Sequence, residues 1–152
     1  MKTKLAIFSF FILTITACSK ESTDPPPTTA TIEEMLTAKT WKTDEIRSQL
    51  SNNTTQYYKR GGSSNTVNYD SDSLKFNSSN TGIHYFNGVA TTTTWNFTNA
   101  EKSKMTIIIN YTPTPVTINW EYINVSPTSL KYTQYSSAGG ISYLASGTRV
   151  PN

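Results

Sequence analysis

Few residues of this chain have side chains suited to acid–base or nucleophilic chemistry. The sequence contains one histidine, His84, and one cysteine, Cys18. A histidine that acts as a general base needs a nucleophile and an orienting carboxylate within reach, and the residues next to His84 suggest no such set. Structural zinc needs four histidine or cysteine ligands, which the chain lacks. We therefore expect His84 to be a surface strand residue, and we expect neither a metal nor another cofactor.

The acidic residues indicate two further kinds of chemistry. Asp70 and Asp72 are spaced as at the start of a calcium loop, but the turn glycine and the distal glutamate of that motif are missing. Hydrolysis of glycosides needs two carboxylates roughly 5–10 Å apart, and Glu121, the acidic residue within a clear strand pattern, has outward parity. We interpret the Asp70–Asp72 segment as a solvated acidic turn and predict that the protein is not an enzyme.

Cys18 follows an export signal. Lys2 and Lys4 precede an apolar run over residues 5–15, which as a helix would cross about half of the hydrocarbon core of a bilayer. Such a segment is typical of a secretory signal peptide. Because Cys18 is the single cysteine, no internal disulfide can form despite the exported context.

The segment Ile15-Thr16-Ala17-Cys18 resembles the lipobox of bacterial lipoproteins. The resemblance implies cleavage before Cys18 and acylation of the cysteine, including palmitate, so that lipid anchors the mature chain to a membrane. An ordinary signal peptide with an incidental cysteine is the alternative. We expect a signal peptide at 1–17, the lipidated cysteine and a proline-rich tether at 18–30, and one folded domain at 31–152. Ser19 after the cysteine favours the outer membrane, on either its periplasmic or its surface face.

The composition restricts the classes of partner. Serine, threonine and asparagine make up more than a third of the chain, and charged residues only 15%. The formal net charge of +3 falls to +1 when Lys2 and Lys4 leave with the signal peptide. Nucleic-acid binders depend on a basic excess that neutralises phosphates, so we expect no nucleic-acid partner.

The elements that must position any site are predicted to be strands. Thr31 and Glu34 fit a capping box, which predicts a short helix through about Ala38. Beyond it, apolar and polar residues alternate, as where Trp95 and Phe97 flank Asn96. The predicted strands cover 40–49, 54–60, 66–69, 73–77, 82–87, 91–98, 104–111, 116–124, 129–135 and 141–149. These local hairpins predict an all-β fold, an antiparallel up-and-down barrel of about eight strands behind a short N-terminal helix.

Five segments carry a family resemblance: the stretch Leu36 to Lys42, a Leu-Lys-Phe strand, a Thr-Trp-Asn-Phe strand, an Ile-rich strand and a Pro-Thr-Ser-Leu-Lys strand. Through these segments the chain resembles the lipocalin-like lipoproteins of Bacteroidota over about residues 31–150. In lipocalins the first strand carries Gly-x-Trp, whereas this chain has Lys39-Thr40-Trp41. The family also has a late arginine packed over that tryptophan. The resemblance therefore implies a cation–π contact between Trp41 and Arg149 that closes the barrel base; a solvated Arg149 is the alternative.

Two groups of residues are candidates for binding. Aromatic side chains with inward parity could line a cavity for a small hydrophobic molecule or a glycan, or could simply fill the core: Trp95, Phe97, Trp120, Tyr122, Tyr132 and Tyr143. Tyr57, Tyr58, Lys59 and Arg60 precede two glycines and could form a contact loop or merely end a strand. We expect a ligand-binding module; the alternative is a structural or accessory subunit that binds another cell-envelope protein through its loops.

Overall fold

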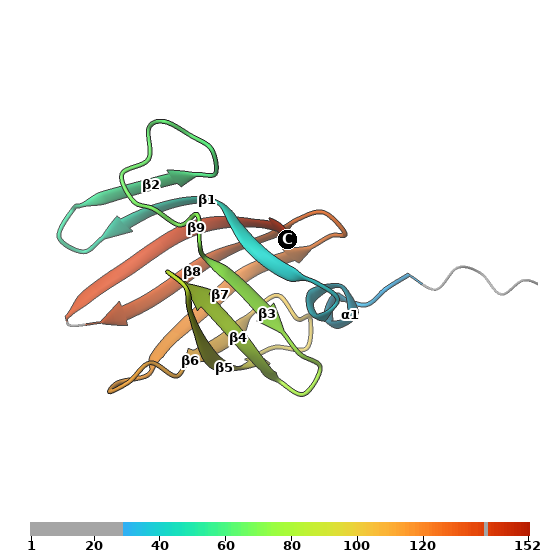
Figure 1. The fold of residues 1–152 in the computed structure, drawn as a ribbon. Helices are drawn as coiled ribbons and strands as arrows, with labels where there is room; N and C mark the ends of the chain where they lie inside the picture. Colours follow the sequence, from blue (N-terminus) through green and yellow to red (C-terminus); the bar gives the residue numbers. More distant parts are fainter. Residues whose placement is uncertain (1–28, 139) are drawn as a thin grey trace, which may run out of the picture.

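The computed structural model describes residues 29–138 and 140–152, which form one short helix and a nine-stranded antiparallel sheet (Figure 1). Cys18 and most of the predicted tether lie outside the described residues. The elements are α1 (Ile32–Thr37), β1 (Thr40–Leu50), β2 (Thr55–Lys59), β3 (Ser73–Phe76), β4 (Thr81–Phe86), β5 (Val89–Phe97), β6 (Met105–Ile109), β7 (Val116–Val125), β8 (Leu130–Ala138) and β9 (Ile141–Pro151).

The sheet closes on itself because the first and last strands pair. β1 runs antiparallel to β9 from Trp41 opposite Pro151 to Leu50 opposite Tyr143. The strands from β3 to β9 pair in chain order, and β3 also pairs with the first residues of β1. β1 and β3–β9 therefore form a closed eight-stranded barrel, which confirms the predicted all-β architecture with a short N-terminal helix.

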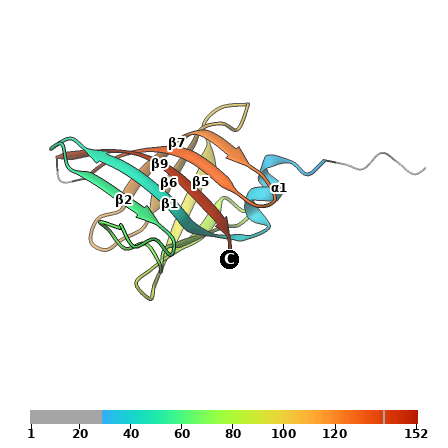
Figure 2. The same cartoon turned by 90° about the horizontal axis from the view of Figure 1, so that it is seen from above.

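β2 lies beside the barrel and pairs only with the later part of β1, between Glu45 and Gln49. The hairpins β1–β2 and β8–β9 extend past the other strands at the end opposite α1 (Figures 1 and 2). The outer edge of β2 is covered by a loop, because the Tyr57 N–H donates to Thr66 Oγ1 over 2.8 Å and the Lys59 N–H donates to Asn65 Oδ1 over 2.8 Å. The predicted strand at 66–69 is wrong, since these loop side chains take the place of a ladder.

The helix α1 covers one end of the barrel. Its capping box is present as predicted, with reciprocal hydrogen bonds between Thr31 and Glu34. The Trp41 indole donates to the carbonyl of Leu36 over 2.8 Å, and Lys75 Nζ donates to the carbonyl of Thr37 over 2.9 Å. These bonds satisfy carbonyls at the helix end and fix it to β1 and β3. Among the described residues, no helix has the length and apolar character needed to cross a membrane.

Large side chains fill the half of the barrel next to α1. Phe76 meets Trp95 edge to face with ring centroids 5.5 Å apart, and it meets Trp120 at 6.0 Å. Other buried members of this half are Leu36, Trp41, Met105, Ile123 and Leu130. An eight-stranded barrel is just wide enough for its own side chains to fill it, and at this end they do.

A β-bulge in β7 changes which residues face the core. The register with β8 shifts between Glu121 and Asn124, and Tyr122 has a φ of 53°. Tyr122 is 72% exposed, whereas the next residue, Ile123, is buried. The prediction that Tyr122 points inward is therefore wrong, because the extra residue of the bulge reverses the alternation.

Gly147 on β9 is required by the packing of Tyr132. A Cβ at Gly147 would lie 2.4 Å from Tyr132 Cζ. The phenol ring cannot move aside easily, because it is stacked on Trp120 with centroids 3.8 Å apart and its hydroxyl accepts a hydrogen bond from Arg149. We expect Gly147→Ala to lower the free energy of unfolding by about 1–3 kcal/mol through overpacking, measured by urea unfolding with tryptophan fluorescence.

The control is Ser146→Ala at the exposed neighbouring position, for which we expect a change within about 0.5 kcal/mol. An unfolding midpoint of Gly147→Ala equal to that of the wild type would contradict the close contact between Gly147 and Tyr132.

Candidate ligand-binding cavity

The half of the barrel away from α1 is hollow. A cavity of about 270 Å³ lies between the strands, and apolar side chains form most of its wall. The residues toward its open end are half-buried rather than sealed from solvent. The lining residues are Ile46, Tyr69, Asp72, Leu74, His84, Phe86, Ile107, Ile109, Tyr111, Val116, Ile118, Trp120, Gln134, Tyr143 and Arg149.

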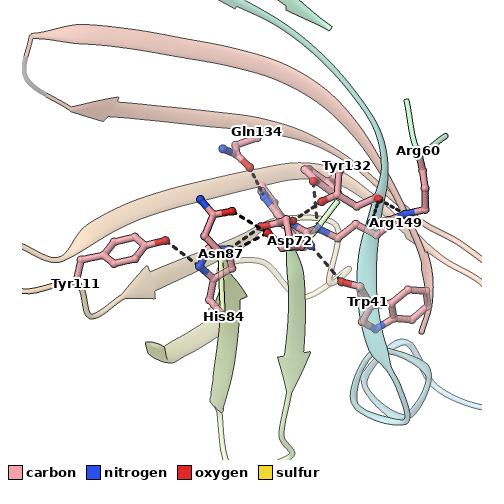
Figure 3. Close-up of polar contacts among 12 residues, drawn as sticks. Trp41, Arg60, Asp72, His84, Asn87, Tyr111, Tyr132, Gln134 and Arg149 are labelled. Carbon is pink, nitrogen blue, oxygen red and sulfur yellow. Dashed lines mark hydrogen bonds and ion pairs between the residues drawn. The ribbon is translucent and has the colours of Figure 1, made fainter. Parts of the chain in front are cut away.

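Three ionisable side chains meet at the floor of this cavity (Figure 3). Asp72 directly precedes β3, His84 lies on β4 and Arg149 lies near the end of β9; all three are less than 9% exposed. Asp72 Oδ2 accepts from Arg149 Nη2 over 2.8 Å, and Asp72 Oδ1 lies 2.7 Å from His84 Nε2. The Thr43 hydroxyl also donates to Asp72 Oδ2. Both carboxylate oxygens are therefore occupied by partners within the protein.

Arg149 is equally occupied. Its Nε donates to the Tyr132 hydroxyl over 3.2 Å, and its Nη1 donates to the Trp41 carbonyl over 3.1 Å. Trp41 and Arg149 thus meet at the barrel base as the resemblance implied, but through a hydrogen bond. The predicted stacking partner is wrong: the guanidinium lies 5.7 Å from the Trp120 ring centroid and 5.9 Å from that of Tyr132. The alternative of a solvated Arg149 is excluded by its burial.

The surroundings of Asp72 keep it ionised. Burial alone would raise the pKa of its carboxyl, but the charge of Arg149 and the hydrogen bonds from His84 and Thr43 outweigh burial and hold the pKa well below its usual range. The Asp72 charge in turn raises the pKa of Arg149 against the opposing effect of burial. The interpretation of Asp72 as part of a solvated turn is therefore wrong; it is the anionic half of a buried ion pair.

His84 connects this ion pair to the cavity. Because an ionised Asp72 can only accept, His84 Nε2 carries a hydrogen and donates it. In a neutral imidazole Nδ1 is then an acceptor, and the Tyr111 hydroxyl, 2.9 Å away, donates to it. The prediction that His84 lies at the surface is wrong. The alternation of residues along the strand indicates the inward position of His84, because His84 lies two residues before the apolar Phe86. The same holds for Asp72, which lies two and four residues before Leu74 and Phe76.

The predicted aromatic group divides between three places. Trp120 and Tyr143 line the cavity, and Tyr132 stacks beneath Trp120. Trp95 is buried in the filled half, where Phe97 packs against it. Tyr122 lies outside the barrel. Ring size does not separate these positions. The position along the strand separates the cavity residues from those of the filled half, and the β7 bulge places Tyr122 outside.

The predicted contact residues 57–60 pack onto β1. Tyr58 is fully buried and donates to Asp70 Oδ1 over 2.7 Å; burial, followed by that hydrogen bond, raises the pKa of Tyr58 to about 12. Lys59 pairs with Asp44, and Arg60 donates twice to the Thr43 carbonyl. Tyr57 is half-buried with the guanidinium of Arg47 over its ring. The segment is therefore the end of a strand, as the alternative interpretation has it, and not a free contact loop.

A second hollow, about 770 Å³, lies at the ends of hairpins β1–β2 and β8–β9 and is lined mostly by polar side chains. It contains no charged residue and is wide open, so the internal cavity is the better site. Within residues 29–138 and 140–152, no three His, Cys, Asp or Glu side chains are close enough together to hold a metal ion.

Comparison with known proteins adds no family assignment. No model of a known protein family matches the sequence, and no curated protein matches it.

The ion pair predicts a pH-dependent effect of Asp72→Asn. Removing one partner of a buried pair leaves the other charge uncompensated, so we expect a loss of about 3–5 kcal/mol of unfolding free energy at pH 7. The lowered pKa of Asp72 means that its contribution is fully present above the unfolded-state pKa, near 4, and is lost as the pH falls further. The difference between wild type and Asp72→Asn, measured by urea unfolding, should therefore shrink between pH 7 and pH 3.

Asp44→Asn is the matched control, because Asp44 pairs with Lys59 at the partly exposed surface. It should cost no more than about 1 kcal/mol at pH 7. Equal costs for the two variants would contradict the special role of the buried pair.

Proposed function

We propose that the protein is a membrane-anchored lipoprotein, attached through lipid on Cys18, whose barrel holds a small, largely apolar molecule. The observation that carries the proposal is the internal cavity, which has aliphatic and aromatic walls and a polar floor whose charges are already paired. Small-molecule sites are typically concave and mostly apolar, with a few placed polar groups, and occupy barrel mouths among other places.

The size of the cavity supports a small ligand. Its volume of about 270 Å³ lies just below the range of about 300–1,000 Å³ that is common for ligand sites. An apolar cavity of about 150 Å³ already binds benzene in another protein. Ligands of one or two fused rings therefore fit this space, whereas a long acyl chain or an oligosaccharide exceeds it.

The position of the cavity supports anchoring at the N-terminus. The described chain begins next to α1 (Figure 1). The lining residues Phe86, Val116 and Tyr143 lie at the strand ends away from α1, because Phe86 ends β4, Val116 begins β7 and Tyr143 lies near the start of β9. A lipid on Cys18 followed by a tether would hold the α1 end toward the bilayer. The mouth of the cavity would then face away from the membrane and be open to ligands.

The lipid anchor predicts a chemical label on one residue. In cells fed an alkyne-bearing palmitate analogue, the wild-type protein should acquire the label and fractionate with membranes, and Cys18→Ala should acquire none, because the thiol is the acyl acceptor. Gel fluorescence after click labelling measures both. Ser19→Ala is the control and should remain labelled. Labelling of Cys18→Ala equal to that of the wild type would rule out this anchor.

The cavity predicts a bound small molecule that one substitution displaces. Native mass spectrometry of the mature lipoprotein, purified from its own host, should show a small-molecule adduct on the wild type. Val116→Trp should remove the adduct, because Val116 lines the cavity and an indole would fill it.

Thr117→Trp on the exposed side of the same strand is the control and should retain the adduct. Absence of an adduct from the wild type, together with co-purification of an envelope protein, would favour the accessory-subunit alternative. An adduct retained by Val116→Trp would contradict binding in the barrel.

A further inference from the structure

The charges at the cavity floor restrict the kind of ligand. Asp72 and Arg149 face the cavity, yet the two oxygens of Asp72 and all three nitrogens of Arg149 already have partners in the protein. These contacts engage three of the five guanidinium N–H groups of Arg149. Because the two opposite charges lie in direct contact, they present no net charge to an ionic ligand. An anion or a cation would therefore lose its hydration in this site without gaining a counter-charge, which is a large penalty in an apolar environment.

The cavity does have free hydrogen-bonding capacity at Tyr111. Its hydroxyl proton points to His84 Nδ1 when the imidazole is neutral, so the oxygen lone pairs of Tyr111 remain available. Asp72 holds His84 in the orientation and tautomer that this arrangement requires, over 2.7 Å. The chain Asp72–His84–Tyr111 therefore presents a fixed acceptor at the wall of the cavity (Figure 3).

Gln134 supplies the complementary group. Its side-chain oxygen accepts a hydrogen bond from the Trp120 indole over 3.1 Å. This bond fixes the orientation of the amide and leaves its nitrogen as the polar atom that can still donate to a ligand. Among the residues that the structure describes, no hydrogen bond occupies that nitrogen, and Gln134 lines the cavity. The site thus offers one acceptor and one donor between largely apolar walls.

From these contacts we propose that the ligand is an uncharged molecule with an apolar ring body and a hydroxyl group, whose hydroxyl donates to the Tyr111 oxygen. This inference rests on the proposed function and specifies its ligand class. A site that hydrogen-bonds a hydroxyl group of its ligand discriminates against an analogue that lacks the hydroxyl. The hydroxyl therefore provides selectivity, and the walls provide most of the affinity.

Four probes with one ring system test the proposal: 1-naphthol, naphthalene, 1-naphthoate and 1-naphthylmethylammonium. Each is titrated at pH 8 into the mature lipoprotein in amphipol, with isotope-labelled isoleucine methyl groups observed by NMR and with empty amphipol as the blank for partitioning. Ile107 and Ile109 line the cavity, whereas Ile108 between them points outward and reports non-specific contact. We expect 1-naphthol to shift Ile107 and Ile109 saturably, without Ile108, and to bind at least about tenfold more tightly than either ion.

The variant Tyr111→Phe isolates the hydroxyl contact. It should weaken 1-naphthol about tenfold and leave naphthalene unchanged, because only the former uses the Tyr111 oxygen. Tyr85→Phe, at an exposed position on β4, is the control and should bind all probes like the wild type. The comparison of probes on the wild-type protein stands even if Tyr111→Phe does not fold.

The outcomes separate the two proposals. If no probe, including naphthalene, shifts Ile107 and Ile109, the proposed function fails. If naphthalene binds but 1-naphthoate or 1-naphthylmethylammonium binds as tightly as 1-naphthol, the cavity binds ligands and the uncharged class is wrong. If 1-naphthol binds no more tightly than naphthalene, the hydroxyl contact is overturned.

Discussion

The buried ion pair of Asp72 and Arg149 is the interaction on which the rest of the structure depends. It joins the start of β3 to the end of β9, and through hydrogen bonds from Thr43 and to the Trp41 carbonyl it includes β1, the strand between them. These are the strands whose pairing closes the barrel. Two charges removed from water are tolerated only when the pair has good geometry and further hydrogen bonds support it. Thr43, His84 and Tyr132 supply such bonds here, so the backbone around the pair has little freedom to rearrange.

The ion pair also marks the boundary between the two halves of the barrel. On the α1 side, the indoles and Phe76 pack edge to face and leave no space. On the other side five of the lining residues are isoleucine or valine, whose side chains are too small to meet across a barrel of this width. Trp120 lies at the boundary, with Tyr132 and Arg149 beneath it and the cavity above. Both halves of the barrel have the same strand topology. The cavity therefore results from the smaller side chains that the strands carry in the half away from α1.

The sequence was informative where one local rule decided the structure. Alternation and the turn residues between the runs located the nine strands, along with a tenth at 66–69 that the structure does not contain, and the capping box located α1. Two bulges, near Asp44 and at Tyr122, escape such reasoning because each reverses the alternation within a strand and is stabilised by partners on other strands. The site was missed for a related reason: Asp72 and His84 were interpreted from their polarity, although their parity placed them inside. Their burial is favourable only because Arg149 arrives from the far end of the chain, a contact that no local pattern contains.

One set of contacts therefore serves both stability and, under the proposed function, selectivity. Because Asp72 and Arg149 neutralise each other, the floor presents no net charge, and its remaining influence on a ligand passes through the hydrogen-bonded chain from His84 to Tyr111. A substitution at the floor would disturb the closure of the barrel as well as the site. The side chains free to vary are those of the wall near the mouth that lie outside the polar contacts, such as Val116; Phe86 is less free, because its ring is stacked on that of His84. Under the proposed function, differences in ligand shape should be encoded there, while the preference for an uncharged ligand would follow from the contacts that also close the barrel.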